Sequence, residues 1–466
     1  MKKFLAIILS LTILLFSGIQ ATAQYDKMTR EYWDMFYASQ HDYNNLPTLN
    51  VGADETMVSL CWHSPSEKAT PEVRVSKNAD MSNYETFTGY NEYAENDYQL
   101  VSRVNINGLE ENTTYYYQWN TGKSWSNICK YETKSFGNHK AVVIGDIQIA
   151  EDTRTEGESQ SDVGFNWNNV LAEALEKNPD ISYLVSPGDN TSTGSTQSEW
   201  QTLNMPEALR GLPMALAIGN HDKKGMLYDY YTNMPNEYYG KFFSGLDRDF
   251  WFRYGDVLYL VFDSTSGDAP DHMAFAKEAV KLNKDAKWRI GVVHHGIYGA
   301  GDAIGDTETE ILLTAIFAPI FETYDLDLVI TGHTHSQGRS HFMQNGKVAE
   351  KAESGKTFKN PKGVVYLNSN SVCEPVIMDY EADHLAYSFM ENDVTTYSTL
   401  EFKDNILELK TFRGDNSQLL DSITIEKTEE FNDSSFIKII SRGIYKVIEF
   451  AGFVYTMIDN LAKKLG

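Results

Sequence analysis

Short runs of alternating apolar and polar residues fill the chain between Pro47 and Lys134. Each run is rich in β-branched and aromatic residues and is bounded by turn-forming residues, a pattern typical of β-strands. Their number and spacing predict a small all-β sandwich over residues 47–136. No metal-ligand spacing occurs there, which favours a supporting or docking module. The predicted strands are Thr56–Trp62, Glu72–Ser76, Tyr98–Ile106, Thr113–Trp119 and Ile128–Thr133.

The pattern changes after His139, where strands that read as buried alternate with helices. Strand, helix and strand in this order predict an α/β domain over residues 138–427. The first helix is indicated by apolar positions at helical spacing: Trp167, Val170, Leu171, Ala174 and Leu175. The strands are Ala141–Ile144, Ser182–Val185, Met214–Ile218, Ile290–Val293 and Leu326–Thr331, followed by the C-terminal runs Ala386–Met390, Thr395–Phe402, Ile406–Phe412 and Ile423–Glu426.

The N-terminus has the pattern of an export signal. Two lysines precede an apolar run that ends at Phe16, and an A-x-A cleavage site ends at Ala23. Because the run is too short to span a bilayer, residues 1–23 are predicted to be a signal peptide rather than an anchor. We therefore expect an exported protein, periplasmic or extracellular, in which residues 24–46 lead into the sandwich.

The C-terminal residues 434–466 are predicted to form an amphipathic helix. Their apolar stripe has a helical period, and lysines and arginines make the segment basic within an acidic protein. Such a helix suits docking onto the protein's own surface, onto a partner subunit in a homo-oligomer, or onto a membrane surface. The stripe consists of Ile440, Ile444, Val447, Ala451, Val454, Ile458, Leu461 and Leu465.

Charge and cysteine content narrow the possible functions. The formal net charge of −25 argues against nucleic acid as a partner. It also means that a site for a phosphorylated substrate must supply its own positive charge, which bound metal ions would do. Three cysteines, Cys61, Cys129 and Cys373, are too few for a disulfide framework. The sequence leaves open whether Cys61 and Cys129 pair or stay reduced.

Polar residues recur directly after the predicted strands of the α/β domain. Because the carboxyl ends of these strands meet at one crevice, we expect the residues to converge there. Asp, Asn and His supply the oxygen and nitrogen ligands that divalent metals accept. The five clusters are Gly145-Asp146-Ile147-Gln148, Gly188-Asp189-Asn190, Gly219-Asn220-His221-Asp222, His294-His295 and Gly332-His333-Thr334-His335.

Each cluster alone has an ordinary structural explanation. A single aspartate at a strand end is usually a turn or cap residue, and a lone histidine pair is more often structural than catalytic. Five clusters in one order, each after an apolar run, are far more specific than any one of them.

This order of motifs resembles the calcineurin-like metallophosphoesterase superfamily. The preceding β-sandwich is similar to the fibronectin-III-like module of purple acid phosphatases. The resemblance implies a four-layer α/β/β/α sandwich preceded by an all-β domain. Two positions depart from the pattern: Gln148 stands where many members have histidine, and Ser192 stands where the purple enzymes have the tyrosine that colours their ferric iron.

The resemblance also implies the roles of individual residues. Two divalent ions (Mn, Fe, Zn or Mg) would be held by seven ligands: Asp146, Gln148 and His335 on the first, Asn220, His294 and His333 on the second, and Asp189 between them. His221 would stabilise charge or protonate the leaving group, and Asp222 would fix its tautomer unless it caps the following turn. Asn220, His295 and Arg339 are expected to contact substrate, although His295 is an alternative to His294 as ligand.

We therefore expect a metal-dependent phosphoesterase that hydrolyses small phosphomonoesters with a hydroxide generated between the two metals. A phosphodiesterase or nucleotide pyrophosphatase using the same site is the alternative enzyme. The alternative of another class is an inactive metal-binding or adhesion module.

Overall fold

The computed structural model describes residues 27–40, 46–64, 70–94, 100–150, 159–240, 248–301, 307–376, 382–391 and 394–428. The predicted signal peptide and the predicted C-terminal helix lie outside these residues. Residues 24–46 contain helix α2 (Arg30–Gln40). Its Trp33 is fully buried, and the indole N–H donates to the carbonyl of Ser161 at 2.9 Å. The lead-in segment is thereby fastened to the α/β domain.

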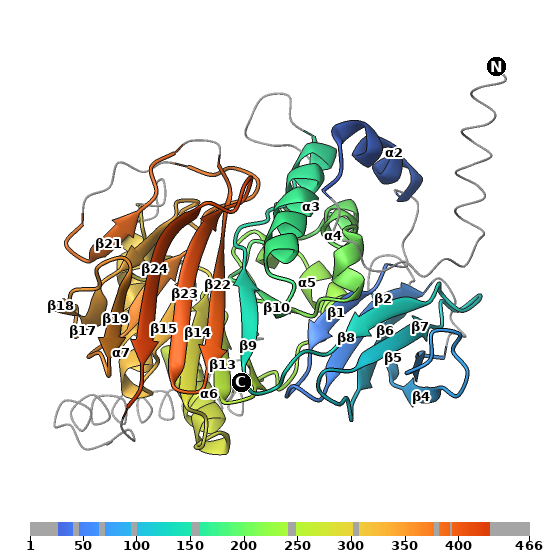
Figure 1. Cartoon of the computed structure of the whole chain (residues 1–466), viewed down its shortest axis with the longest axis horizontal. Helices are drawn as coiled ribbons and strands as arrows, with labels where there is room; N and C mark the ends of the chain where they lie inside the picture. The colour runs from blue at the N-terminus through green and yellow to red at the C-terminus, as the bar shows by residue number, and fades with distance from the viewer. Residues whose placement is uncertain are drawn as a thin grey trace, which may run out of the picture.

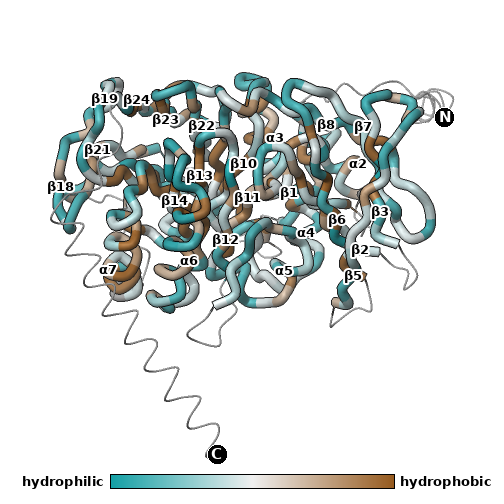
Figure 2. The backbone as a smooth tube through the Cα atoms, turned by 90° about the horizontal axis from the view of Figure 1, so that it is seen from below, coloured by the Kyte–Doolittle hydropathy of each residue, from teal (hydrophilic) through white to brown (hydrophobic). Residues whose placement is uncertain are grey.

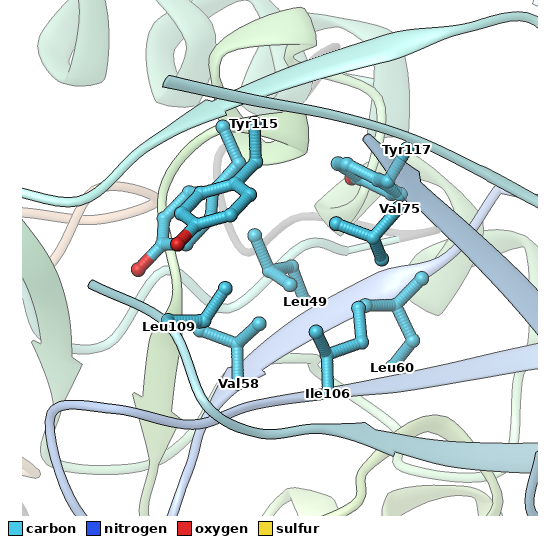
Figure 3. Close-up of a pocket in the computed structure, with 9 residues that line it drawn as sticks. Leu49, Val58, Leu60, Val75, Ile106, Leu109, Tyr115 and Tyr117 are labelled. Carbon is cyan, nitrogen blue, oxygen red and sulfur yellow. The ribbon is translucent and has the colours of Figure 1, made fainter. Parts of the chain in front are cut away.

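The N-terminal module is the predicted β-sandwich (Figure 1, blue to teal). Strands β4, β3, β7 and β8 form one sheet, and β1, β2, β6 and β5 lie together in the other. Figure 3 shows the apolar side chains that meet between them, among them Leu49, Leu60, Val75 and Tyr117. The strands are β1 (Thr48–Val51), β2 (Val58–Ser64), β3 (Glu72–Ser76), β4 (Glu85–Thr88), β5 (Tyr90–Tyr93), β6 (Leu100–Ile106), β7 (Thr114–Trp119) and β8 (Cys129–Glu132).

The α/β domain begins with three parallel strands and the helices that cover them. Strands β9, β10 and β11 pair in parallel, and the antiparallel strand β22 pairs with β9. The elements of this part are β9 (His139–Val143), α3 (Gln160–Lys177), β10 (Ile181–Ser186), α4 (Gln197–Leu203), η1 (Glu207–Arg210), β11 (Met214–Leu216), η2 (Asp222–Lys224) and α5 (Leu227–Tyr231).

A second sheet packs against the first. Its order is β12-β13-β14-β15-β20-β16-β21, with β13, β14, β15 and β20 parallel. The elements from here to the end of the described chain are β12 (Phe250–Tyr254), β13 (Val257–Phe262), α6 (Ala269–Leu282), β14 (Trp288–Val293), α7 (Thr307–Thr323), β15 (Leu328–Thr331), β16 (Gly338–Ser340), β17 (Phe342–Gln344), β18 (Lys347–Glu350), β19 (Lys356–Lys359), β20 (Val365–Asn368), β21 (Leu385–Ser388), β22 (Thr396–Lys403), β23 (Ile406–Arg413) and β24 (Leu419–Glu426). Among them, β19, β22, β23 and β24 belong to the first sheet, and β17 and β18 form a two-stranded sheet.

Alternation along β13 explains the four layers. Tyr259 and Val261 belong to the core between the two sheets, whereas Leu258 and Leu260 belong to a second core. That second core contains Phe275 of α6 and other side chains of α6 and α7. A strand buried on both faces reads as a continuous apolar run, and Figure 2 shows such hydrophobic stretches in the interior strands. The predicted α/β/β/α sandwich is confirmed.

The first sheet continues across the predicted boundary between the domains. Within the described residues its order is β19-β24-β23-β22-β9-β10-β11-β1-β2-β6-β5. Strand β1 of the sandwich runs parallel to β11, with Asn50 opposite Met214. The buried Asn50 amide donates to the carbonyl of Met214 at 3.1 Å and accepts the backbone N–H of Asn233 at 3.0 Å. The two modules therefore share a sheet.

The strands predicted between residues 56 and 133 and around the ligand motifs are present, with ends that shift by at most two residues. Cys61, Cys129 and Cys373 are free thiols in the described structure. Burial raises the pKa of both Cys61 and Cys129 to about 11, so neither forms a thiolate near neutral pH. No helix in the described part of the chain is long and apolar enough to cross a membrane.

Candidate metal centre

The predicted ligands occupy loops that follow strands of both sheets. Because the carboxyl ends of parallel strands meet at the same edge, these loops converge. In chain order they carry Asp146 and Gln148 after β9, Asp189 after β10, Asn220 after β11, His294 after β14, and His333 and His335 after β15.

Five of these seven residues have left-handed backbone conformations, which are uncommon outside glycine. A non-glycine residue held there costs on the order of 1–3 kcal/mol unless the surrounding structure compensates. The residues are Asp146 (φ 42°), Gln148 (φ 46°), Asp189 (φ 49°), His333 (φ 72°) and His335 (φ 56°). Strain concentrated in this way is typical of a functional site.

Asp189, His294 and His333 form the centre of the cluster. One potential ligand atom from each lies within 4.8 Å of the other two. Nε2 of His294 is 3.1 Å from Oδ2 of Asp189 and 2.9 Å from Oδ1 of Asn220. A carboxylate, an amide oxygen and two imidazoles at this spacing fit a divalent metal ion.

Asp146 and His335 form a second group beside the first. Nε2 of His335 is 3.6 Å from Oδ1 of Asp146. The backbone N–H of His333 donates to the Asp146 carboxylate at 2.9 Å, and that of Gln148 donates to the carbonyl of Asp189 at 2.8 Å. These bonds place the two groups next to each other, with Asp189 and His333 at the junction.

The carboxylates and imidazoles in the cluster shift one another's pKa values. Burial alone would raise the pKa of Asp189, but His294 and His221 hold it below its ordinary value. Burial would lower the pKa of His294, yet Asp189 and Asp146 raise it to about 9. Burial, with a contribution from Asp189, raises the pKa of Asp146 well above its usual value. The cluster thus favours bound positive charge, as a cation site must.

Comparison with known proteins supports the resemblance. The signature of the calcineurin-like phosphoesterases matches residues 139–337, which contain all seven candidate ligands, and the signature of the purple acid phosphatase N-terminal domain matches residues 45–133. Residues 139–337 therefore form a calcineurin-like phosphoesterase domain. The β-sandwich is a purple acid phosphatase N-terminal domain.

Individual proteins resemble this chain in sequence or in fold. Purple acid phosphatase 1 of Ipomoea batatas is 25% identical over 311 residues, which are 62% of this chain and 62% of that relative's length. The structure of a purple acid phosphatase from yellow lupin (Lupinus luteus) seeds shares the fold, with a TM-score of 0.68 and 14% identity, over 84% of this chain and 76% of that one. PhoD gives a TM-score of 0.52 with 12% identity, over 90% and 99% of the two chains.

His221 of the phosphoesterase domain lies at the edge of the cluster, but Asp222 does not fix its tautomer as predicted. Nδ1 of His221 is 2.5 Å from the carbonyl oxygen of Ser192, so Nδ1 carries the proton that this oxygen accepts. The buried Asp222 carboxylate instead accepts backbone N–H groups of Thr191 and Gly219, each at 3.0 Å. Asp222 therefore joins two ligand loops, a structural role that differs from the predicted cap of the following turn.

Arg339 does not contact the cluster, and its prediction as a substrate-binding residue is wrong. Its side chain is fully buried, and its guanidinium makes two bonds to Asp421 of β24, with Nε to Oδ2 at 2.6 Å and Nη2 to Oδ1 at 3.1 Å. A third bond reaches the carbonyl of Ala352 at 3.1 Å. Because β16 and β24 belong to different sheets, this ion pair joins the sheets.

We predict that Arg339→Met lowers stability without weakening substrate binding. Removal of one partner leaves the other charge buried and unpaired, which costs about 3–5 kcal/mol. Urea denaturation should show this loss, and Arg339→Met/Asp421→Leu should recover much of it because no charge then remains buried. An increase in KM with stability unchanged would contradict this structural role and support substrate binding by Arg339.

His294, rather than its neighbour, supplies the ring in the ligand cluster. The His295 ring lies 4.5 Å from the His333 ring, and its Nδ1 is 2.7 Å from Oγ of Ser264. Burial, followed by His294 and His333, lowers the pKa of His295 well below its ordinary value, so this ring is neutral. His295 thus stands beside the metal ligands as a polar, uncharged group.

No tyrosine takes the place of Ser192 among the described ligand contacts. Tyr298, which lies in the loop after His295, packs edge-on against Tyr366 with the ring centroids 5.0 Å apart, and beside His384 at 5.7 Å. Its ring belongs to the packing around the second core.

Sequence reasoning missed two lysines that directly follow the third motif. Nζ of Lys224 lies 3.0 Å from Nδ1 of His221, and Nζ of Lys223 donates to the carbonyl of Thr265 at 2.8 Å. Adjacent lysines after a ligand motif in such an acidic chain were the available signal, since a phosphate site needs local positive charge. Ser192 and Ser264 carried no such signal, because their contacts arise from loops distant in sequence.

Proposed function

We propose that this protein hydrolyses phosphomonoesters at a centre for two divalent metal ions. The observation that carries the proposal is the convergence of Asp189, His294 and His333 with their ligand atoms within 4.8 Å, beside the Asp146–His335 pair. The family match supports the same reaction class.

The candidate ligands fall into two sets, one for each proposed ion. Asp146, Gln148 and His335 would hold one ion, Asn220, His294 and His333 would hold the other, and Asp189 would be a ligand of both. When bound, the ions neutralise phosphate charge and lower the pKa of a water molecule, so that a nucleophile exists near neutral pH. Neither serine nor cysteine is needed as a nucleophile.

His221 acts on the charge that develops at the leaving group. Since Nδ1–H is directed to the Ser192 carbonyl, Nε2 is the nitrogen available to substrate. Burial lowers the pKa of this ring, and a phosphate dianion arriving beside it favours the imidazolium. The protonated Nε2 can then donate to the leaving oxygen. Lys223 and Lys224 supply further positive charge near the site.

The decisive experiment is turnover by the metal-loaded protein of a panel of phosphomonoesters, diesters and nucleotides. We expect p-nitrophenyl phosphate to be cleaved with a higher kcat/KM than bis(p-nitrophenyl) phosphate. Preference for the diester, or for the pyrophosphate bond of nucleotides, would favour the alternative enzyme class. Metal binding without turnover of any ester would favour an inactive binding module.

Metal content provides a separate prediction. The first site combines carboxylates, an amide oxygen and one imidazole, a donor set that suits Mn²⁺, Mg²⁺ or Fe²⁺, whereas the second, with more imidazole, also suits Zn²⁺. Ser192 cannot give the visible charge-transfer band of a tyrosinate. We expect a colourless protein that loses turnover in chelator and regains it with added Mn²⁺. A purple preparation whose colour disappears when a tyrosine is mutated would contradict this assignment.

We also propose that the protein is exported, because residues 1–23 have the composition of a signal peptide. N-terminal sequencing of the mature protein should begin at Gln24. The basic segment 434–466 is proposed to dock onto the protein itself or a second copy rather than a membrane. Truncation at Ser434, followed by size-exclusion chromatography and liposome flotation, distinguishes these cases.

A further inference from the structure

Ser264 lies in the turn between β13 and α6 and makes two contacts with one residue. Its Oγ accepts the backbone N–H of His295 at 3.1 Å and lies 2.7 Å from Nδ1 of the same histidine. Both side chains are buried. Ser264 is thus the hydroxyl that holds the ring standing beside the metal ligand His333.

The hydrogens of this contact can be assigned. The backbone N–H of His295 can only donate, so Oγ of Ser264 accepts that bond. Among the described residues, Nδ1 is the only other partner of this hydroxyl, so the arrangement that also uses the hydroxyl hydrogen directs it to Nδ1. Nδ1 is then an acceptor, and a neutral ring carries its proton on Nε2. No described residue accepts a hydrogen bond from that Nε2–H.

A buried pair fixes the turn that carries Ser264. The Asp249 carboxylate accepts the backbone N–H of Asp263 at 2.7 Å and bonds to Nδ1 of His272 at 2.7 Å. Nε2 of His272 bonds in turn to the carbonyl of Ser266 at 3.1 Å. Asp249 and His272 are fully buried. Asp249 and His272 therefore hold Asp263 and Ser266, on either side of Ser264, in place. This limits the freedom of the Ser264 hydroxyl to move away from His295.

We propose that Ser264 is a positioning residue that fixes the tautomer and orientation of His295, so that Nε2–H of His295 donates a hydrogen bond to a phosphoryl oxygen of the substrate. This inference rests on the proposed phosphoesterase function. A phosphoryl oxygen fits because Nε2 is the ring nitrogen that Ser264 leaves free to donate, the ring lies next to a metal ligand, and phosphate oxygens accept hydrogen bonds. The nearby ammonium of Lys223, held by Thr265 of the same turn, adds charge of the sign that an anion requires.

The test compares Ser264→Ala with two other variants in the metal-loaded full-length protein. Loss of an oriented hydrogen bond to a charged group lowers kcat/KM by roughly tenfold or more, and we expect Ser264→Ala and His295→Ala each to do so. Ser266→Ala is the matched control, because among the described side chains and backbone its hydroxyl contacts the backbone N–H of Asp268, which it accepts at 3.3 Å in the same turn. It should retain the wild-type value. Both metals should stay bound in all three.

The double variant Ser264→Ala/His295→Ala separates positioning from a general structural effect. If Ser264 acts through His295, the double variant should be no worse than His295→Ala alone. Multiplied losses, or an equal loss in Ser266→Ala, would overturn the proposal.

Two further measurements do not depend on turnover. The affinity for inorganic phosphate should fall in Ser264→Ala and recover in Ser264→Thr, which retains the hydroxyl. In histidine-selective ¹⁵N NMR, the resonance assigned to His295 should show a protonated Nε2 in the wild type and tautomer averaging in Ser264→Ala. A protonated Nδ1 in the wild type would overturn the proposal. Absence of turnover of every ester by a wild type that has this Nε2 signature would instead contradict the proposed function.

Discussion

Asp189→Asn is expected to reduce kcat for p-nitrophenyl phosphate by several orders of magnitude. Both carboxylate oxygens are engaged at the site, with Oδ1 accepting the backbone N–H of His221 at 2.8 Å and Oδ2 facing Nε2 of His294 at 3.1 Å. An asparagine replaces one of these acceptors by an NH₂ donor and removes the shared negative charge. Both proposed ions then lose a ligand at once.

Asp421→Asn provides the control, because that carboxylate is also buried but pairs with Arg339 far along the chain. It should lose stability and keep kcat near the wild-type value. Metal content by mass spectrometry should fall in Asp189→Asn and not in the control. Near-normal turnover by folded Asp189→Asn would remove the two-metal proposal.

His221→Ala is expected to lower kcat by on the order of 10²–10⁴, the usual contribution of one acid–base or charge-stabilising group. Both metals should remain, since His221 is not among the proposed ligands. His384→Ala is a matched control: that half-buried ring likewise contacts a backbone carbonyl, Gly299, at 2.9 Å. The control should keep kcat near the wild-type value.

The leaving group decides which role His221 has. A nitrophenolate needs little protonation, so a general acid at His221 predicts a smaller loss for the nitrophenyl ester than for an alkyl ester. Equal losses would identify charge stabilisation instead. Full activity in His221→Ala with either ester would exclude both roles.

The convergence of the candidate ligands could be predicted from the sequence because its signal is local. A polar residue directly after a buried strand lies at the carboxyl edge of the sheet whatever the loop lengths, and this placed Asp146, Asp189, His294 and His333 together. The left-handed conformations of the ligands could not be read in advance, although Asp, Asn and His tolerate them better than most residues. The choice between His294 and His295 required coordinates, because adjacent residues point in different directions.

The wrong assignments have a common physical cause. Asp222 and Arg339 were assigned roles at the site because each lies close to a motif along the chain. In the folded protein each side chain binds other partners. The Asp222 carboxylate accepts hydrogen bonds from backbone N–H groups of two loops. Arg339 pairs with Asp421, which is 82 residues away in sequence. Partners at such separations leave no trace in a local pattern.

The pairing of β1 with β11 also bears on how the molecule can move and be divided. Modules joined by a linker can swing apart to admit a substrate, but here such a hinge would have to break sheet hydrogen bonds and uncover the amide of Asn50. The shared sheet thus disfavours any access route that needs the two modules to separate. For the same reason, a catalytic fragment cut at residue 138 would present β11 as a new open edge, a known route to aggregation. The β-sandwich thus serves as an edge cover for the phosphoesterase domain.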